Sequence, residues 1–127
     1  DLINLMTMDY GGGTAPDQMG EHAISAAEAT HEQLAALYPD KSNAELWAMI
    51  GITPMIGLND VDPEEFTLED AAMVTEFAIE RGIGRLAMWS MERDRECVSG
   101  QRAVMWNCSG ILQDEYAFTQ IFNAVTG

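Results

Sequence analysis

Short apolar runs alternate with longer amphipathic stretches along this chain. The apolar runs cover residues 2–8, 46–58 and 84–89, and each one ends in polar, charged or aromatic residues. Strands that alternate with helices are typical of a parallel sheet with crossover helices. The pattern therefore predicts an α/β fold in the order β-α-β-α-β-loop-α, in one domain over residues 1–127 with no second domain.

The amphipathic stretches predict the helices. The first runs from Asp17 to Tyr38 and is ended by Pro39. The second begins at the N-cap Thr67, with Asp70 in a capping-box position, and ends at Gly82. A shorter helix is expected over residues 115–123. The expected inner faces are Ala23, Ala26, Ala27, Thr30, Leu34 and Leu37, then Ala71, Val74, Thr75, Ala78 and Ile79, then Phe118, Ile121, Phe122 and Val125.

Chemistry-bearing residues follow the first and the third apolar run. Asp9 and Tyr10 precede three glycines, Gly11–Gly13, which let the backbone turn sharply and approach a ligand closely. Trp89 ends the third run, beside a cluster of charge. Parallel α/β folds keep their active sites at the C-terminal ends of the strands. These tips are therefore candidate site positions, and a buried strand closed by a polar turn is the alternative.

The charge balance excludes one class of partner. Acidic residues number 21 against six basic ones, the net charge is −15, and Lys41 is the only lysine. Nucleic acid is excluded as a partner because phosphate binding needs basic residues. Such a surface favours a halophilic or marine source, and an ordinary acidic secreted bacterial protein is the alternative. No apolar stretch indicates a membrane span.

No metal site is expected. His22 and His31 lie nine residues apart on one predicted helix, which is not the i, i+4 spacing of a metal pair. Both are expected to be exposed helix residues. Cys97 and Cys108 are too few for a zinc site of their own.

Three motifs in order carry a resemblance. They are Met6–Gly11 (Met-Thr-Met-Asp-Tyr-Gly), Met49–Gly57 with Asn59-Asp60, and Leu86–Ser90 with Arg93-Asp94. Together they resemble the last three strands of a glycoside hydrolase family 18 chitinase, in the archaeal and bacterial branch with Met-x-Met-Asp-Tyr on the sixth strand. The resemblance covers nearly the whole chain. It implies the C-terminal portion of a (β/α)8 TIM barrel, from strand six to the closing helix.

The resemblance also implies an activity, the hydrolysis of β-1,4-linked N-acetylglucosamine polymers by substrate-assisted retaining catalysis. In this chemistry the nucleophile is the acetamido oxygen of the sugar rather than a second carboxylate. Asp9 would stabilise the charge that develops on the acetamido group, and Tyr10 would donate a hydrogen bond nearby.

Substrate-binding roles follow from the same resemblance. Met6 and Met8 would line the pocket around the acetyl methyl group, a task suited to a polarisable thioether. Trp89 would form the floor under the sugar ring. Asn59 and Asp60 would contact sugar hydroxyls, and loop capping is an equal alternative for both.

The resemblance also bears on the cysteines. Chitin lies outside the cell, where disulfides persist, so the intact protein is expected to be secreted and a Cys97–Cys108 bridge is expected. Two free buried thiols are the alternative.

The general acid of the family is the glutamate of an Asp-x-x-Asp-x-Asp-x-Glu motif on the fourth strand, and the chain lacks that motif. Residues 60–64 match its last part only. We reject that match because Gly57 stands where the first aspartate should be, and because Pro63 would remove a donor from a central strand. A polar loop before the second helix is expected there instead.

The isolated chain is therefore expected to be inactive, and no cofactor is implied. The expected partners are a chitin or N-acetylglucosamine oligosaccharide and the missing N-terminal half of the barrel. A non-catalytic sugar-binding half-barrel and a self-associating half-barrel are the alternatives.

Overall fold

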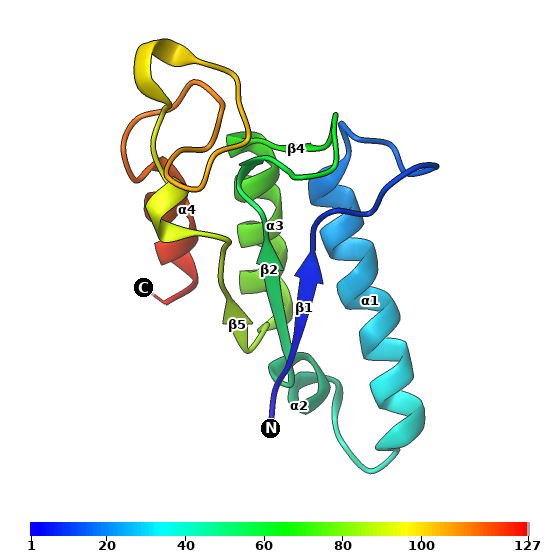
Figure 1. The fold of residues 1–127 in the computed structure, drawn as a ribbon. Helices are drawn as coiled ribbons and strands as arrows, with labels where there is room; N and C mark the ends of the chain where they lie inside the picture. Colours follow the sequence, from blue (N-terminus) through cyan, green and yellow to red (C-terminus); the bar gives the residue numbers. More distant parts are fainter. Residues whose placement is uncertain (127) are drawn as a thin grey trace.

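A parallel sheet in the order β1-β2-β5 forms the centre of the protein (Figure 1). The computed structural model describes residues 1–126. Strands β1 (Ile3–Thr7) and β2 (Ile50–Pro54) pair in parallel over their whole length, and β5 (Arg85–Leu86) pairs in parallel with β2. The predicted α/β fold with three parallel strands is confirmed. Because all three strands run the same way, their C-terminal ends lie at one edge of the sheet.

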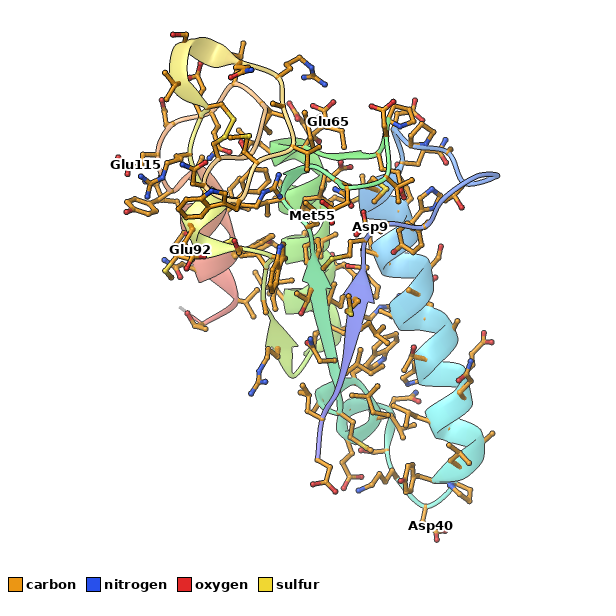
Figure 2. The ribbon with its side chains drawn as sticks, viewed as in Figure 1. Asp9, Asp40, Met55, Glu65, Glu92 and Glu115 are labelled. Atoms are coloured by element: carbon orange, nitrogen blue, oxygen red, sulfur yellow. A yellow bond between two sulfur atoms is a disulfide. The ribbon has the colours of Figure 1, made fainter. Side chains whose placement is uncertain are left out.

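Helices cover one face of this sheet (Figure 2). α1 (Met19–Leu37) and α3 (Leu68–Arg81) contact each other, and α4 (Ala117–Phe122) packs on α3. Single 3₁₀ turns cover Met91–Arg93, Val98–Gly100 and Asn123–Val125. The buried core contains Met19, Ala23, Ala27, Leu34, Ile50, Ile52, Ala71, Val74, Phe77, Ala78, Phe118 and Phe122.

The second predicted helix is confirmed at both ends. The Thr67 hydroxyl accepts a hydrogen bond from the Asp70 backbone N–H at 3.1 Å, and the Asp70 carboxylate accepts one from the Thr67 backbone N–H at 2.8 Å. Gly82 ends the helix in the left-handed conformation, with φ at 74°. That conformation favours glycine because it carries no Cβ.

Two inner-face positions were predicted wrongly. Leu37 and Ile79 are exposed, whereas Met19 and Phe77 are buried in their place. Leu37 is the last residue of α1, beyond the buried Leu34, so nothing covers it. Phe77 is drawn inward by aromatic packing, with its ring edge-on to Trp47 at a centroid distance of 5.7 Å.

The middle apolar run is not one strand. Residues 43–48 form a short helix, α2 (Asn43–Ala48), before β2 begins. Ser42 and Glu45 make a capping box at its start, and this local signal outweighs the apolar character of the run. After β2 the chain forms an antiparallel pair that was not predicted, β3 (Gly57–Leu58) with β4 (Glu65–Phe66). This hairpin comes directly before α3.

The expectation that both histidines are exposed is wrong. His22 is half-buried with Nε2 at 2.8 Å from the carbonyl oxygen of Ala15, and His31 stacks on Trp47 at 4.1 Å between ring centroids. Both rings border the inner face of α1, where apolar and aromatic partners are available. Among residues 1–126, no three His, Cys, Asp or Glu side chains are arranged to hold a metal ion, and no helix is long and apolar enough to cross a membrane.

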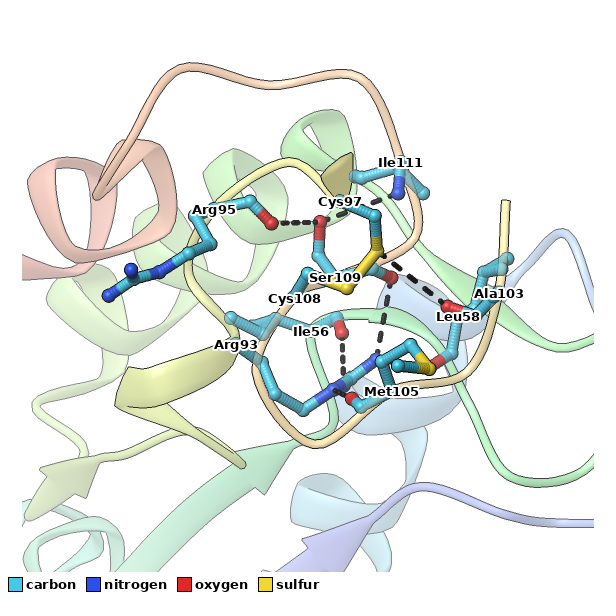
Figure 3. Close-up of a disulfide and its surroundings, with 10 residues drawn as sticks. All are labelled: Ile56, Leu58, Arg93, Arg95, Cys97, Ala103, Met105, Cys108, Ser109 and Ile111. Atoms are coloured by element: carbon cyan, nitrogen blue, oxygen red, sulfur yellow. Dashed lines mark hydrogen bonds between the residues drawn. A yellow bond between two sulfur atoms is a disulfide. The ribbon is translucent and has the colours of Figure 1, made fainter. Parts of the chain in front are cut away.

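A disulfide closes the long loop after β5. Cys97 and Cys108 are bonded, so the expected bridge is present and the alternative of free thiols is excluded (Figure 3). The bridge ties together the two ends of a loop that contains little regular structure. The disulfide therefore helps to hold this loop in place, in addition to its backbone hydrogen bonds.

Arg93 connects this loop to the corner between β2 and β3 (Figure 3). Its side chain is 1% exposed. The guanidinium donates to the carbonyl oxygens of Ile56 at 2.6 Å, Leu58 at 2.8 Å and Met105 at 2.8 Å, and more weakly to that of Ser109 at 3.4 Å. It makes no ion pair within the described chain. Backbone carbonyls thus replace the water that the buried cation has lost.

We predict that Arg93→Met destabilises the protein strongly. The change leaves the carbonyl oxygens of Ile56, Leu58 and Met105 without this donor, and a buried acceptor left unpaired costs about 1–3 kcal/mol. Denaturant unfolding should show a loss of about 3 kcal/mol or more in the free energy of unfolding. The control is Arg102→Met, which removes only an exposed ion pair to Glu65 at 3.0 Å. Equal losses in the two variants would contradict the prediction.

Within residues 1–126, no helix covers the second face of the sheet (Figure 1). Asn4 and Met6 of β1 lie on this face, and Met6 is 74% exposed. Strands β1 and β5 are both sheet edges, and an apolar groove of about 540 Å³ lies between β5 and α4. Unpaired strand edges and exposed apolar surface favour association with another polypeptide.

We therefore predict that the isolated 127-residue segment does not persist as a stable, well-folded monomer in dilute solution. Sedimentation should show association, or thermal unfolding should lack a cooperative transition. A monomeric mass together with a cooperative melt would show that the open face tolerates water.

Candidate functional site

The C-terminal strand ends converge on a pocket of about 450 Å³. Its size lies within the usual range for small-molecule sites. Met55 and Asp9 lie close to this edge of the sheet (Figure 2). The lining residues are Asn4, Met6, Met8, Asp9, Thr53, Met55, Asp60 and Trp89. Five of the seven sequence-predicted site residues, Met6, Met8, Asp9, Asp60 and Trp89, are thus brought together.

Asp9 sits in a turn that requires support. Its φ is 54°, in the left-handed region that non-glycine residues rarely adopt. The Asp9 backbone N–H donates to Oδ1 of Asn59 at 3.3 Å, and its own Oδ1 accepts from the Val61 backbone N–H at 3.2 Å. Such strained residues persist only where the surroundings hold them, and they are concentrated at functional sites. Within residues 1–126, Asp9 Oδ2 accepts no hydrogen bond and so remains available to a ligand.

Tyr10 does not join the pocket, contrary to expectation. Its ring packs edge-on against His22 at a centroid distance of 5.5 Å, on the helix-covered side of the sheet. The hydroxyl is buried and has no hydrogen-bond partner among the described residues. Burial, followed by the negative charge of Glu64, raises the pKa of Tyr10 to about 12. The left-handed turn at Asp9 separates the two neighbours, so only the carboxylate reaches the pocket.

Trp89 extends the sheet beyond β5. Its backbone N–H donates to the Pro54 carbonyl at 2.8 Å, and its own carbonyl accepts from the Ile56 N–H at 3.0 Å. The Trp89–Ser90 peptide bond is cis. These two hydrogen bonds hold the Trp89 backbone, while its side chain remains 59% exposed and presents an aromatic surface to the pocket. An apolar ring with a polar N–H is suited to binding amphipathic ligands such as sugars.

The structure separates the roles of Asn59 and Asp60. Asn59 is 1% exposed, and its amide nitrogen donates to the carbonyls of Met55 at 3.0 Å and Gly57 at 3.2 Å. Together with the bond from Asp9, these contacts occupy its polar atoms, as the loop-capping alternative expects. Asp60 is exposed and lines the pocket, so it is placed to contact a ligand.

Sequence reasoning missed several members of the site. Asn4 donates to the Thr53 hydroxyl at 2.7 Å across the strand pair, and both line the pocket with Met55. Asn4 alternates with Met6 and Met8, so the two-residue period of a strand could have identified it. Thr53 of β2 and Met55, the residue directly after that strand, follow the same period.

The charged side chains that line the pocket are both negative. Asp9 and Asp60 line the pocket, whereas the Arg93 guanidinium is buried. Burial lowers the pKa of Arg93, and the negative charges of Asp60 and Asp9 oppose that effect. A pocket with two carboxylates and apolar walls stabilises positive charge that develops on a bound molecule.

Curated relatives of this chain are chitinases. It is 38% identical over 134 residues to the probable bifunctional chitinase/lysozyme of Escherichia coli strain K12, covering 98% of this chain and 15% of that protein. It is 43% identical over 99 residues to Endochitinase 11 of Metarhizium anisopliae, covering 72% of this chain and 19% of that protein. The chain therefore spans less than a fifth of the length of these relatives. No model of a known protein family matches the chain.

Solved structures agree with these relatives. The catalytic domain of the hyperthermophilic chitinase from Pyrococcus furiosus matches with a TM-score of 0.89 and 42% identity, over 99% of this chain and 40% of that chain. Catalytic-site mutants of active domain 2 of the Pyrococcus furiosus chitinase, complexed with chito-oligosaccharides, match equally well. The α/β fold therefore resembles that of a chitinase catalytic domain. The chain belongs to the chitinases of glycoside hydrolase family 18 and matches a C-terminal portion of such a protein.

We predict that Tyr10 titrates well above an ordinary tyrosine. The difference in phenolate absorbance between the wild type and Tyr10→Phe should show a pKa of about 12, against about 10 for a free side chain. Because the folded pKa exceeds the unfolded one, this group stabilises the fold fully below about pH 10, and the contribution is lost as the pH rises to about 12. A Tyr10 transition near pH 10 would show that the phenol is open to solvent.

Proposed function

We propose that this chain is the part of a chitinase that binds and orients the sugar at the bond to be cleaved. The intact protein would hydrolyse β-1,4-linked N-acetylglucosamine polymers by substrate-assisted retaining catalysis. The observation that carries the proposal is the Asp9 carboxylate, held in a strained turn at the tip of β1 inside a pocket walled by Met6, Met8 and Trp89. The likeness to a chitinase domain solved with chito-oligosaccharides supports the same substrate class.

The chemistry assigns Asp9 a specific task. The acetamido oxygen attacks the anomeric carbon while the bond to the leaving sugar oxygen breaks, and that oxygen takes a proton from a general acid outside this chain. The cyclic oxazolinium ion formed in this step carries positive charge, and water then opens it. Asp9 Oδ2 would accept a hydrogen bond from the acetamido N–H and offset this charge, mostly in the transition state.

The remaining pocket residues bind the sugar. Trp89 would support the apolar face of the ring, and the thioethers of Met6 and Met8 would surround the acetyl methyl group. Asp60 would accept hydrogen bonds from sugar hydroxyls. Tyr10 has no direct role in this proposal, because its hydroxyl is enclosed on the other side of the sheet.

The general acid would come from the remainder of a (β/α)8 barrel, of which this chain supplies strands six to eight and the closing helix. The open sheet face, the two free strand edges and the 40% coverage of the Pyrococcus furiosus domain support this arrangement. The isolated chain would then be inactive. A substrate as large as chitin favours secretion of the intact protein, in agreement with the disulfide.

The open face also supports a second arrangement, in which two copies of the chain associate through it. A separate alternative, a half-barrel without catalysis, would bind N-acetylglucosamine oligosaccharides without cleaving them. Binding of a chito-oligosaccharide with no hydrolysis by the full-length protein would favour this second function.

We predict that Asp9→Asn lowers turnover more than substrate affinity. The change keeps the shape of the side chain and removes its charge, and the loss of one such contact costs on the order of 10²-fold in kcat. Trp89→Ala should raise KM as well as lower kcat. Hydrolysis of a chromogenic chitobioside by the full-length protein measures both effects.

The matched control is Asp62→Asn, an exposed carboxylate of the same loop as Asp60 that does not line the pocket. It should retain wild-type kinetics. Asp60→Asn should raise KM because Asp60 lines the pocket. Wild-type turnover by Asp9→Asn would refute the assigned role.

A further inference from the structure

The loop of residues 59–64 holds the turn that carries Asp9. Three successive backbone N–H groups of that turn donate to side chains of the loop. The Asp9 N–H donates to Asn59, the Tyr10 N–H to Glu64 Oε1 at 2.7 Å, and the Gly11 N–H to Glu64 Oε2 at 3.4 Å. Each oxygen of the Glu64 carboxylate thus accepts one backbone donor from the turn.

The contact is reciprocal. Asp9 Oδ1 accepts from the Val61 N–H at 3.2 Å, so the loop donates to the turn as well as accepting from it. The loop itself is closed by two bonds, from the Asn59 N–H to the Glu64 carbonyl at 3.0 Å and from the Glu64 N–H to the Val61 carbonyl at 2.9 Å. Turn and loop therefore form one hydrogen-bonded unit between segments about fifty residues apart.

Glu64 is buried without a cation. It is 2% exposed, and it forms no ion pair with a Lys, Arg or His side chain in residues 1–126. A buried carboxylate is costly unless hydrogen bonds replace its water. Here the two backbone N–H groups of the turn provide that replacement, and hydrogen bonds to a charged acceptor are the stronger kind.

We propose that Glu64 is a positioning residue for the catalytic pocket: its buried carboxylate holds the Tyr10–Gly11 backbone and thereby fixes the direction of the Asp9 carboxylate. The role of Asp9 rests on the function proposed above. Glu64 itself does not line the pocket, and both of its oxygens are occupied by the turn. It acts through Asp9 rather than on the sugar.

The strain at Asp9 makes this support necessary. A φ of 54° costs free energy in a residue with a Cβ, and the neighbouring Gly11 has a φ of 84°. Removal of the Glu64 carboxylate leaves two backbone donors unpaired, and the turn can then relax toward negative φ. Relaxation would move the Asp9 carboxylate away from Val61, and a displacement of about 1 Å at a reacting centre can cost about 10²-fold in rate.

The test compares two variants of Glu64 in the full-length protein with matched changes at Asp70. Glu64→Leu removes both acceptors, and Glu64→Gln keeps one acceptor oxygen without the charge. Asp70 is also a buried carboxylate that accepts a backbone N–H, at 2.8 Å from Thr67, but it caps α3 away from the pocket. Asp70→Leu and Asp70→Asn therefore measure the cost of losing such a carboxylate without touching the turn.

Two readouts are combined, kcat and KM for a chromogenic chitobioside and amide hydrogen exchange at Tyr10 and Gly11. For Glu64→Leu we expect kcat to fall about 10- to 100-fold with KM changed less than about threefold, and exchange at both amides to accelerate. Glu64→Gln should recover most of kcat. The Asp70 variants should lose thermal stability while kcat and the two exchange rates stay at wild-type values.

Unchanged exchange at Tyr10 and Gly11 in Glu64→Leu would overturn the proposal, as would a kcat loss equal to that of Asp70→Leu. If Glu64→Leu does not fold, Glu64→Gln decides through exchange alone. Its single acceptor oxygen can pair with only one of the two amides, so wild-type exchange at both Tyr10 and Gly11 in that variant would also overturn the proposal. If the wild-type protein does not cleave the chitobioside, the proposed function fails, and the exchange rates alone then support or overturn the hold of Glu64 on the turn.

Discussion

The burial of the Arg93 guanidinium is the constraint on which the corner between β2 and β3 and the disulfide loop depend. A cation that is 1% exposed needs acceptors in every direction in which it donates. Ile56 and Leu58 provide them from the corner between β2 and β3, and Met105 and Ser109 provide them from the disulfide loop. The corner and the loop must therefore meet at one point, although neither contains enough regular structure to define its own position.

The corner held by Arg93 leads directly into the loop that supports Asp9. Asn59 follows Leu58 and folds back on Met55 and Gly57, and the loop closes at Glu64. Each step is a hydrogen bond to a buried group, so a change at one step leaves a polar atom unpaired at the next. The strained Asp9 turn lies at the end of this series, where the stability of the fold is used to hold a functional group.

The two faces of the sheet have different physical roles. One face buries apolar side chains under α1 and α3. The other face presents Asn4, Met6 and Thr53 toward the pocket, and no helix of the described part of the chain covers it. In parallel α/β proteins the binding chemistry collects at the C-terminal strand ends, because all the strands deliver their last residues to one edge. The different roles of the two faces explain how Asp9 reaches the pocket while the adjacent Tyr10 packs against the core on the other side.

Local signals in the sequence determined much of the fold. The 3.6-residue period of α1, the Thr67–Asp70 capping box and the glycine at position 82 act within one or two helical turns, so they could be read without the rest of the chain. The motifs around Asp9 and Trp89 indicated the family and most of the pocket. Only the tertiary structure decided the direction of Tyr10 and the buried roles of Asn59, Glu64 and Arg93. Most of the partners of these groups lie 12 to 54 residues away along the chain. Periodicity describes only neighbours on one element, whereas the hydrogen bonding of a buried polar group depends on which elements meet.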